Sequence, residues 1–246
     1  VVVIKASDYT FDAPASIPAG YNTFRLSNGG KELHHVQIVQ LLQGKTFADF
    51  TESMKKQGPP PVWAKVVGGP NASAPSGPVS EATVKLDAGN YALLCVIPSP
   101  DGTPHVMKGM VRPLTVIAAS GEKAAEPKAD VTVHLNDYGF VMPHTLTKGT
   151  HTFKIVNDAM QPHEMLVVAL APGKTVNDMA SWVAGGMKGP PPAMPVGGVT
   201  GMAKGTSNVI PVEMKAGEYG LLCFMPDAKD GKPHVDHGMM AQLRVK

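Results

Sequence analysis

The run Ala88-Gly89-Asn90-Tyr91-Ala92-Leu93-Leu94-Cys95 returns later in the chain as Ala216-Gly217-Glu218-Tyr219-Gly220-Leu221-Leu222-Cys223. Each copy is a short apolar run that follows a glycine, a pattern that predicts a buried β-strand ending at a cysteine. Further pairs recur in the same order at an offset of 128 to 131 residues: Asp8-Tyr9 with Asp137-Tyr138, Gly58-Pro59-Pro60-Pro61 with Gly189-Pro190-Pro191-Pro192, Pro104-His105 with Pro233-His234, and Gly109-Met110 with Gly238-Met239. This repetition predicts that one domain has been duplicated in tandem.

The repeat divides the chain into three predicted parts. Residues 1–118 form the first domain and residues 129–246 form the second. Residues 119–128, between them, are small and polar, as expected of a linker.

Composition narrows the class of protein. The chain has 246 residues, of which 43% are hydrophobic and 17% charged, with a net charge of +2. This balance supports a packed core and argues against nucleic acid as a partner. No apolar run reaches the roughly 18–20 residues that a transmembrane helix needs. The chain begins on the strand-like run 1–4 and carries no signal peptide, although a leader removed by processing would leave no trace.

The abundance of turn-forming residues predicts an all-β fold, with one β domain in each half. Gly (26) and Pro (23) are both frequent, and short apolar runs alternate with them. One short helix is expected in each half, beginning after Thr46 and after Thr175, because apolar residues recur there at helical spacing. Each helix runs into a Gly-Pro-Pro-Pro segment, which should end it and lead into a long loop.

The two cysteines, Cys95 and Cys223, occupy equivalent positions of the two copies. A disulfide between them would need their Cα atoms within about 7 Å, so that the two equivalent strands would have to lie side by side. We therefore expect each cysteine to be a free thiol or a metal ligand.

The same four residue types accompany each other in both halves. A histidine follows an asparagine upstream, and a cysteine, a Pro-His pair and a Gly-Met pair follow in that order. Thiolate, two imidazoles and a weak thioether make up the donor set of a blue-copper site. The residues concerned are His34, Cys95, His105 and Met110 in the first half, and His163, Cys223, His234 and Met239 in the second.

This order resembles the cupredoxin family, which includes plastocyanin and azurin, over nearly the whole chain. The resemblance implies two tandem Greek-key β-sandwiches, and it implies that the eight residues named above are copper ligands. One feature departs from the family pattern, because typical members place the second histidine two to four residues after the cysteine. Here nine residues intervene in the first half and ten in the second. An Asp-Gly turn in this segment would allow the histidine to return to the site, or the histidine would lie outside it.

The resemblance favours a periplasmic or secreted electron-transfer protein with a type 1-like site in one or both domains and a redox partner protein. The alternative is a metal-free module that presents its Gly-Pro-Pro-Pro loops as a binding surface, and copper storage or delivery is a further alternative. Enzyme activity is not expected, because no His-x-His cluster occurs. His35 and His237 lack counterparts in the other half, so both are expected to be exposed, and His237 is the better spare ligand.

Overall fold

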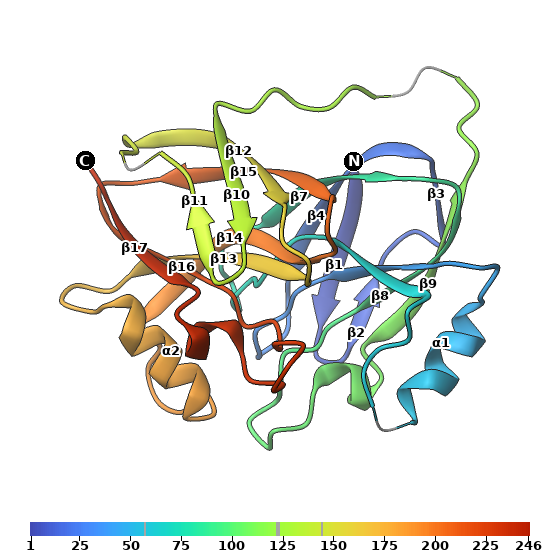
Figure 1. The fold of residues 1–246 in the computed structure, drawn as a ribbon, viewed down its shortest axis with the longest axis horizontal. Coiled ribbons are helices and arrows are strands. Elements are labelled where there is room, and N and C mark those ends of the chain that lie inside the picture. Colours follow the sequence, from blue (N-terminus) through green and yellow to red (C-terminus); the bar gives the residue numbers. More distant parts are fainter. Residues whose placement is uncertain (57, 122–123, 144) are drawn as a thin grey trace.

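The computed structural model describes residues 1–56, 58–121, 124–143 and 145–246, and its described part is built almost wholly of strands (Figure 1). The first half contains β1 Val2–Ser7, β2 Thr10–Asp12, β3 Ser16–Pro18, β4 Gly20–Asn28, β5 Gln37–Leu41, α1 Phe47–Met54, β6 Ala64–Gly68, β7 Ser80–Leu86, β8 Gly89–Leu94 and β9 Val111–Ile117. The second half contains β10 Val131–Asn136, β11 Gly139–Val141, β12 Gly149–Asn157, β13 His163–Leu170, α2 Val176–Ala184, β14 Ala193–Met202, β15 Ser207–Met214, β16 Gly217–Leu222 and β17 Met240–Val245. The expected all-β fold is confirmed.

Each half is a Greek-key sandwich of two sheets, as the resemblance implied. In the second half, the strand order β11-β10-β12-β15 faces the order β17-β16-β13-β14. The first half repeats this arrangement with β2-β1-β4-β7 facing β6-β5-β8-β9, to which β3 is added at the edge. Alternate residues of each strand point into the space between the sheets, which gives β1 and β10 the same alternation of buried and exposed residues.

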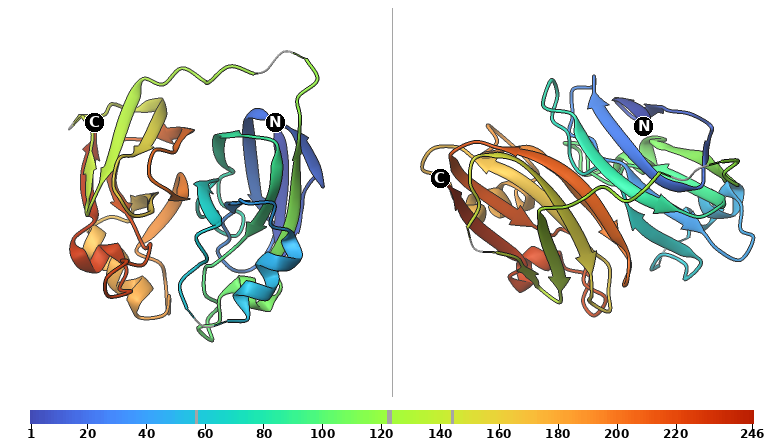
Figure 2. Two further views of the ribbon diagram at one scale, coloured as in Figure 1. Left: turned by 45° about the vertical axis from the view of Figure 1, so that its right-hand side comes forward. Right: turned by 90° about the horizontal axis from the view of Figure 1, so that it is seen from above.

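Both sheets continue from one half into the other. Strand β7 pairs with β15, and β6 pairs with β14, so that an eight-stranded and a nine-stranded sheet run through the whole molecule. The two halves stand side by side in Figure 2, with the N-terminal half in blue to green and the C-terminal half in yellow to red. Joining the sheets pairs strand edges that would otherwise be open. One hydrophobic core extends through both halves.

The expectation of a long loop after each Gly-Pro-Pro-Pro segment is wrong in the second half, where the ten-residue strand β14 follows. In the first half the short strand β6 comes first, and residues 69–79 then form the expected loop, with isolated bridges at Pro70 and Ser73. Strands β6 and β14 lie at the junction. Gly69, directly after β6, and Gly198, in β14, allow close approach of backbone segments within their own halves. A Cβ on Gly69 would lie 2.2 Å from the carbonyl oxygen of Val36, and one on Gly198 would lie 2.2 Å from that of Met165. Both glycines also have positive φ angles, of 129° and 134°, which other residues rarely adopt.

The two expected helices are confirmed. Thr46 caps α1 and Thr175 caps α2, each through a capping box with the aspartate three residues later. Helix α1 buries Phe50 against β5 and β8, and α2 buries Val176 and Met179 against β13 and β16. The helices thus cover the outer faces of the strands that precede the two cysteines.

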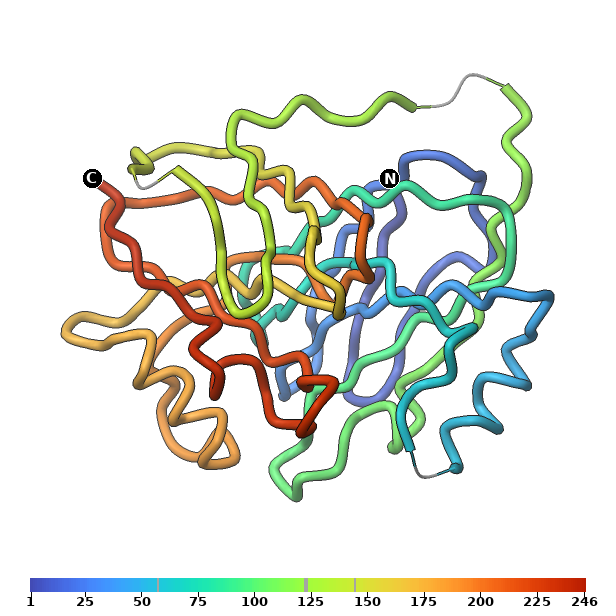
Figure 3. Tube along the Cα trace, in the orientation of Figure 1, coloured from blue at the N-terminus to red at the C-terminus, as the bar shows by residue number. Residues whose placement is uncertain are grey.

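The predicted linker contains no helix or strand at residues 119–121 and 124–128, whereas residues 122–123 lie outside the described part. The Cα trace in Figure 3 passes from the green half to the yellow half through this stretch. The domain boundaries at 118 and 129 stay a prediction. None of the helices in the described residues is long and apolar enough to cross a membrane.

Candidate metal centres

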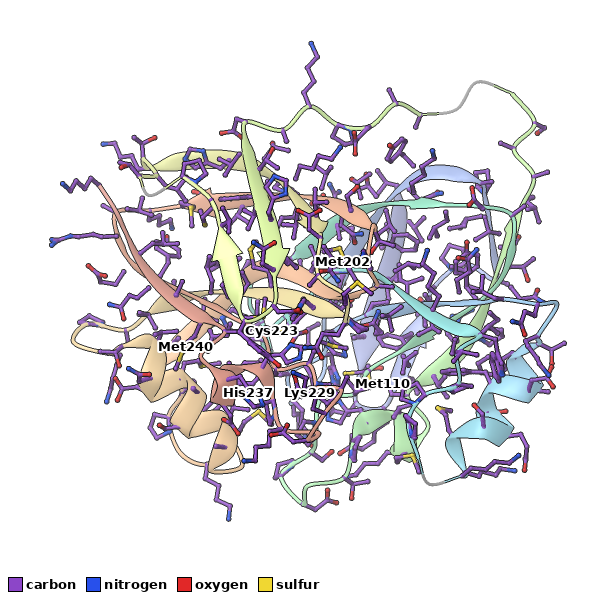
Figure 4. All side chains as sticks on the ribbon, viewed as in Figure 1. Met110, Met202, Cys223, Lys229, His237 and Met240 are labelled. Carbon is purple, nitrogen blue, oxygen red and sulfur yellow. The ribbon has the colours of Figure 1, made fainter. Side chains whose placement is uncertain are left out.

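Two groups of histidine and cysteine side chains, one in each half, lie at the same end of their sandwiches. In the first half, His34 precedes β5, Cys95 follows β8, and His105 opens the short 3-10 helix His105–Lys108. In the second half the corresponding residues are His163, Cys223 and His234. All six side chains are fully buried. Figure 4 labels Cys223 in the second half and Met110 in the first.

The long segment between Cys95 and His105 folds back on itself as a small hairpin. Ser99 N–H donates to the carbonyl of Thr103 at 2.9 Å, and Gly102, with a φ of 82°, completes the turn. His105 N–H then donates to the carbonyl of Ile97 at 3.0 Å, which returns the histidine to the cysteine. The second half does the same, with Asp227 N–H donating to Lys232 at 2.8 Å. The longer spacing therefore leaves the donors together.

The donor atoms of the first group converge on one point. The Nδ1 atoms of His34 and His105 are 3.1 Å apart, and the Sγ atom of Cys95 lies 3.4 Å from Nδ1 of His105. Two nitrogens at about 2 Å and a sulfur at about 2.3 Å from a metal in a trigonal plane would be separated by about 3.5 Å. The observed spacings suit such a plane.

The second group has the same shape. The Nδ1 atoms of His163 and His234 are 2.9 Å apart. The Sγ atom of Cys223 lies 3.8 Å from Nδ1 of His163 and 3.3 Å from Nδ1 of His234. The repetition of this triangle in both halves indicates that the three side chains form a defined donor group rather than a chance contact.

Carboxylates hold the far nitrogens of these histidines. His34 Nε2 lies 3.1 Å from Asp8 Oδ1, and His105 Nε2 lies 2.7 Å from Glu32 Oε2. An ionised carboxylate accepts only, so each Nε2 carries its proton and each Nδ1 presents a lone pair. The two lone pairs would then face each other at 3.1 Å, an arrangement that a cation between them stabilises. The first donor group therefore fits a metal.

Burial favours the neutral forms of the donor side chains that it affects. Burial lowers the pKa of His34 and lowers that of His234 to about 4, so these two imidazoles are neutral at pH 7. Burial also raises the pKa of the Cys95 thiol to about 12 and raises that of Cys223. A thiolate at either position needs a bound cation, and binding would release the thiol proton.

The methionines predicted as axial ligands lie beside the cysteines. Met110 and Met239 are both fully buried. The carbonyl of Met110 accepts the Cys95 N–H at 3.2 Å, and the carbonyl of Met239 accepts the Cys223 N–H at the same distance. Gly109 and Gly238, with φ angles of 101° and 89°, turn the chain from the 3-10 helix into each methionine. Their role as axial ligands stays a prediction.

The expectation that His35 is exposed is wrong. His35 is 5% exposed, and its Nε2 accepts the backbone N–H of Val96 at 3.0 Å. Burial lowers its pKa to about 3. Its position in the second half is taken by Glu164, which accepts the N–H of Phe224 at 2.8 Å and whose pKa burial raises to about 7. Because His35 has no identical counterpart in the second half, the sequence did not indicate that this position faces the junction between the halves.

His237 lies outside the buried donor group of the second half. His237 is exposed, as expected, and its Nε2 lies 3.2 Å from Asp230 Oδ1. Asp227 is also near, which makes a mixed group of two carboxylates and one imidazole. In the first half, Lys108 pairs with Asp101 at 2.9 Å in the same place, so the His237 contact corresponds to an ion pair.

Sequence reasoning missed the carboxylates on the histidine Nε2 atoms. Asp8 and Asp137 belong to the repeated Asp-Tyr pair, and that repetition was the available signal. Asp137 Oδ1 lies 3.2 Å from His163 Nε2, which matches the contact of Asp8 with His34. Glu32 had no such signal, because the second half carries Gln161 at its position.

Comparison with known proteins identifies several likenesses. No protein-family model matches the sequence, and no curated protein matches it either. Among solved structures, a reduced auracyanin from Roseiflexus castenholzii aligns with 21% identity over 46% of this chain and 94% of that one, with a TM-score of 0.33. Auracyanin B aligns with 15% identity over 50% of this chain and 93% of that one, with a TM-score of 0.35. A copper-containing nitrite reductase from Thermus scotoductus aligns with 12% identity over all of this chain and 61% of that one, with a TM-score of 0.26.

The fold and the donor groups together define a class of protein. The chain has the fold of two tandem cupredoxin-like Greek-key sandwiches, with a buried His-Cys-His group in each. The predicted resemblance to cupredoxins is thereby confirmed. Two neutral imidazoles and a thiolate are donors that suit copper, so the side chains present fit the metal that the resemblance implies.

Proposed function

We propose that this protein is an electron-transfer protein that holds one copper ion in each half. The observation that carries the proposal is the convergence of two Nδ1 atoms and one Sγ atom at a buried point, repeated in both halves. His34, Cys95 and His105 would hold the metal in the first half, with Met110 axial. His163, Cys223, His234 and Met239 would do so in the second half. Bound copper would supply a single electron through its change between two oxidation states.

The fold supports this role because it holds the donor side chains in place and buries them away from water. The hairpin after each cysteine and the strand before it are tied together by backbone hydrogen bonds, so that the donor triangle is held before metal binds. The backbone N–H of His35 also lies 3.5 Å from Cys95 Sγ, and that of Glu164 lies 3.4 Å from Cys223 Sγ. A donor to sulfur disperses the negative charge of a thiolate. A donor group held in this way would change its geometry little between the two oxidation states of copper.

The surface beside the first group suits a redox partner protein. Val96, next to Cys95, is 47% exposed, and Met107, two residues after His105, is 60% exposed. Apolar side chains exposed next to a buried centre provide a place for a partner to dock at a short distance from the metal. The second half has Phe224 and Asp236 at these positions, so the first half is the better docking face.

A carrier is proposed rather than an enzyme. The sequence carries no His-x-His cluster of the kind that multicopper oxidases use to bind further copper ions. We place the protein in the periplasm or outside the cell, where copper proteins of this type exchange electrons. The competing functions are a metal-free binding module and a protein for copper storage or delivery.

The test is a titration of the purified protein with Cu(II), followed by the visible spectrum and the copper content. We expect two bound coppers and an intense thiolate-to-copper band. Cys95→Ser and Cys223→Ser should each remove one copper and about half of the band, and the double variant should remove both. Serine is close in size to cysteine, so circular dichroism of the variants should match that of the parent protein.

The alternatives give different results in the same experiment. A protein that binds no copper and shows no band would be a metal-free module. Tight binding of Cu(I) without reversible oxidation would indicate storage or delivery. A band that survives in the double variant would contradict the ligand assignment.

A further inference from the structure

The second histidine of each group is held differently in the two halves. His105 Nε2 lies 2.7 Å from Glu32 Oε2, which is a short, charge-assisted hydrogen bond. Its counterpart His234 is equally buried, yet its Nε2 has no hydrogen-bond partner among the residues that the structure describes. The nearest carboxylate oxygen, on Asp227, lies 3.9 Å away. The first histidines do not differ in this way, because Asp8 and Asp137 hold them at 3.1 and 3.2 Å.

An exchange of two residues produces this difference. The first half has Glu32 and Ser99, and the second half has Gln161 and Asp227 at the same positions. The carboxylate has thus moved from the segment before the first histidine to the hairpin after the cysteine. In its new place the carboxylate makes no hydrogen bond to His234, because other donors already bind it.

The contacts of the tyrosine and the amide account for the new position of the carboxylate. In the first half, Tyr9 OH donates to Glu32 Oε1 at 2.9 Å and leaves Oε2 free for the histidine. In the second half, Tyr138 OH donates to Asp227 Oδ2, and Gln161 Nε2 donates to the same oxygen at 3.0 Å. The carboxylate oxygen nearest to His234 is therefore already engaged.

We propose that Glu32 is a positioning residue that lowers the reduction potential of the first copper site, and that the exchange leaves the second site with the higher potential. This inference rests on the proposed function. A carboxylate on the far nitrogen makes an imidazole a stronger donor at its near nitrogen, and a stronger donor stabilises Cu(II) relative to Cu(I). His234 lacks that support. Electrons would then pass from the first half to the second.

A second difference between the halves acts in the opposite direction. Glu164 lies next to the thiol of Cys223, where the first half has His35, and an ionised carboxylate there would lower the potential of the second site. The effect of Glu32 is therefore measured within each half, where the residue beside the cysteine stays the same.

The experiment measures the midpoint potential of each site from the bleaching of its thiolate-to-copper band. The first site is measured in the Cys223→Ser background, and the second in the Cys95→Ser background. Glu32→Gln, alone or with Ser99→Asp, gives the first half the residues of the second and should raise its potential. Gln161→Glu with Asp227→Ser gives the second half the residues of the first and should lower its potential. Glu81→Gln, which removes a carboxylate paired with Arg25 on the sheet, is the control and should leave both potentials unchanged.

The possible results separate this inference from the proposed function. A parent protein without a copper band would overturn both. Copper bound at both sites, with potentials that do not move in Glu32→Gln or in the reverse exchange, would overturn the inference alone. A shift as large in Glu81→Gln would also overturn it, because net charge would then account for the effect. Loss of copper in Glu32→Gln would show that Glu32 is needed for binding rather than for tuning.

Discussion

His35 in the first half and Glu164 in the second occupy the same position and perform the same task with different chemistry. His35 Nε2 accepts the N–H of Val96 at 3.0 Å, and Glu164 Oε1 accepts the N–H of Phe224 at 2.8 Å. Either side chain satisfies a backbone donor that would otherwise be left without a partner. The comparison shows that the structure requires an acceptor at this position, whereas it does not require a particular residue.

The buried donors behave in the opposite way. All four predicted ligand positions carry the same residue in both halves, although the surrounding sequence has diverged. A hydrogen-bond acceptor can be replaced by another of similar reach, whereas the affinity and geometry of a metal site depend on the particular donor atoms that its ligands supply. This difference in tolerance is the physical reason to regard the donor groups as functional.

The largest expected effect comes from adding a Cβ to either of the two equivalent glycines at the junction between the halves. Gly69→Ala and Gly198→Ala each place a Cβ 2.2 Å from a backbone oxygen, at a positive φ. We expect each to lower the free energy of unfolding by about 3 kcal/mol, because strain and a steric clash combine. Urea denaturation followed by circular dichroism measures the loss. Gly139→Ala, which has nothing within 4 Å of the added Cβ, is the control. Unchanged midpoints in both variants would contradict the close approach of Gly69 to Val36 and of Gly198 to Met165.

An intermediate effect should follow from removing the acceptor beside each cysteine. His35→Leu and Glu164→Leu leave the N–H of Val96 or of Phe224 without its partner. Each should cost about 1–3 kcal/mol of stability, which is the penalty of an unmade buried hydrogen bond. Glu164→Gln keeps an acceptor oxygen and should cost less than Glu164→Leu. Thermal unfolding of the copper-free protein compares the three. Equal losses in the glutamine and leucine variants would show that the hydrogen bond is unimportant.

The smallest effect concerns a position that titrates in one half only. His151 Nε2 donates to the carbonyl of Thr147 at 2.8 Å, and its counterpart Asn22 donates to the carbonyl of Pro18 at 2.9 Å. Asp130, which contacts His151 Nδ1 at 2.7 Å, raises the pKa of the histidine above 6.5. The stabilisation is therefore fully present below about pH 6.5 and is lost as the pH rises through the higher folded-state pKa.

His151→Asn tests this effect, because it gives the second half the residue of the first. It should remove the pH-dependent part, which amounts to less than about 1 kcal/mol for a partly exposed pair. Stability measured from pH 5 to pH 9 checks the result. A variant with the same pH profile as the parent protein would place the titration elsewhere.

Much of the fold was predictable because it is encoded locally. The strand before each cysteine, the two helices and their threonine caps all appear in the sequence as apolar spacing and capping residues. The strands β6 and β14, which follow the helices, were not predictable. A glycine-rich run is typical of a loop, but here Gly198 lies in β14, a strand that pairs with β6 of the other half.

The candidate sites were predictable in composition but not in surroundings. Repetition in the chain predicted the eight donors, and the structure brings the histidines and cysteines of each half together. The carboxylate of Glu32 and the burial of His35 escaped notice, because neither residue has an identical counterpart and both depend on contacts made by distant segments.

The sequence by itself determined the duplication, the all-β class, the helix positions and the donor set, since each of these is written in residue order, spacing or local conformational preference. Only the tertiary structure decided that the sheets join across the halves and that His105 and His234 return to their cysteines. It also decided that Glu32 reaches one histidine while Asp227 fails to reach the other. These features depend on where separate segments meet in space, and packing sets those meetings through distances that residue order does not record.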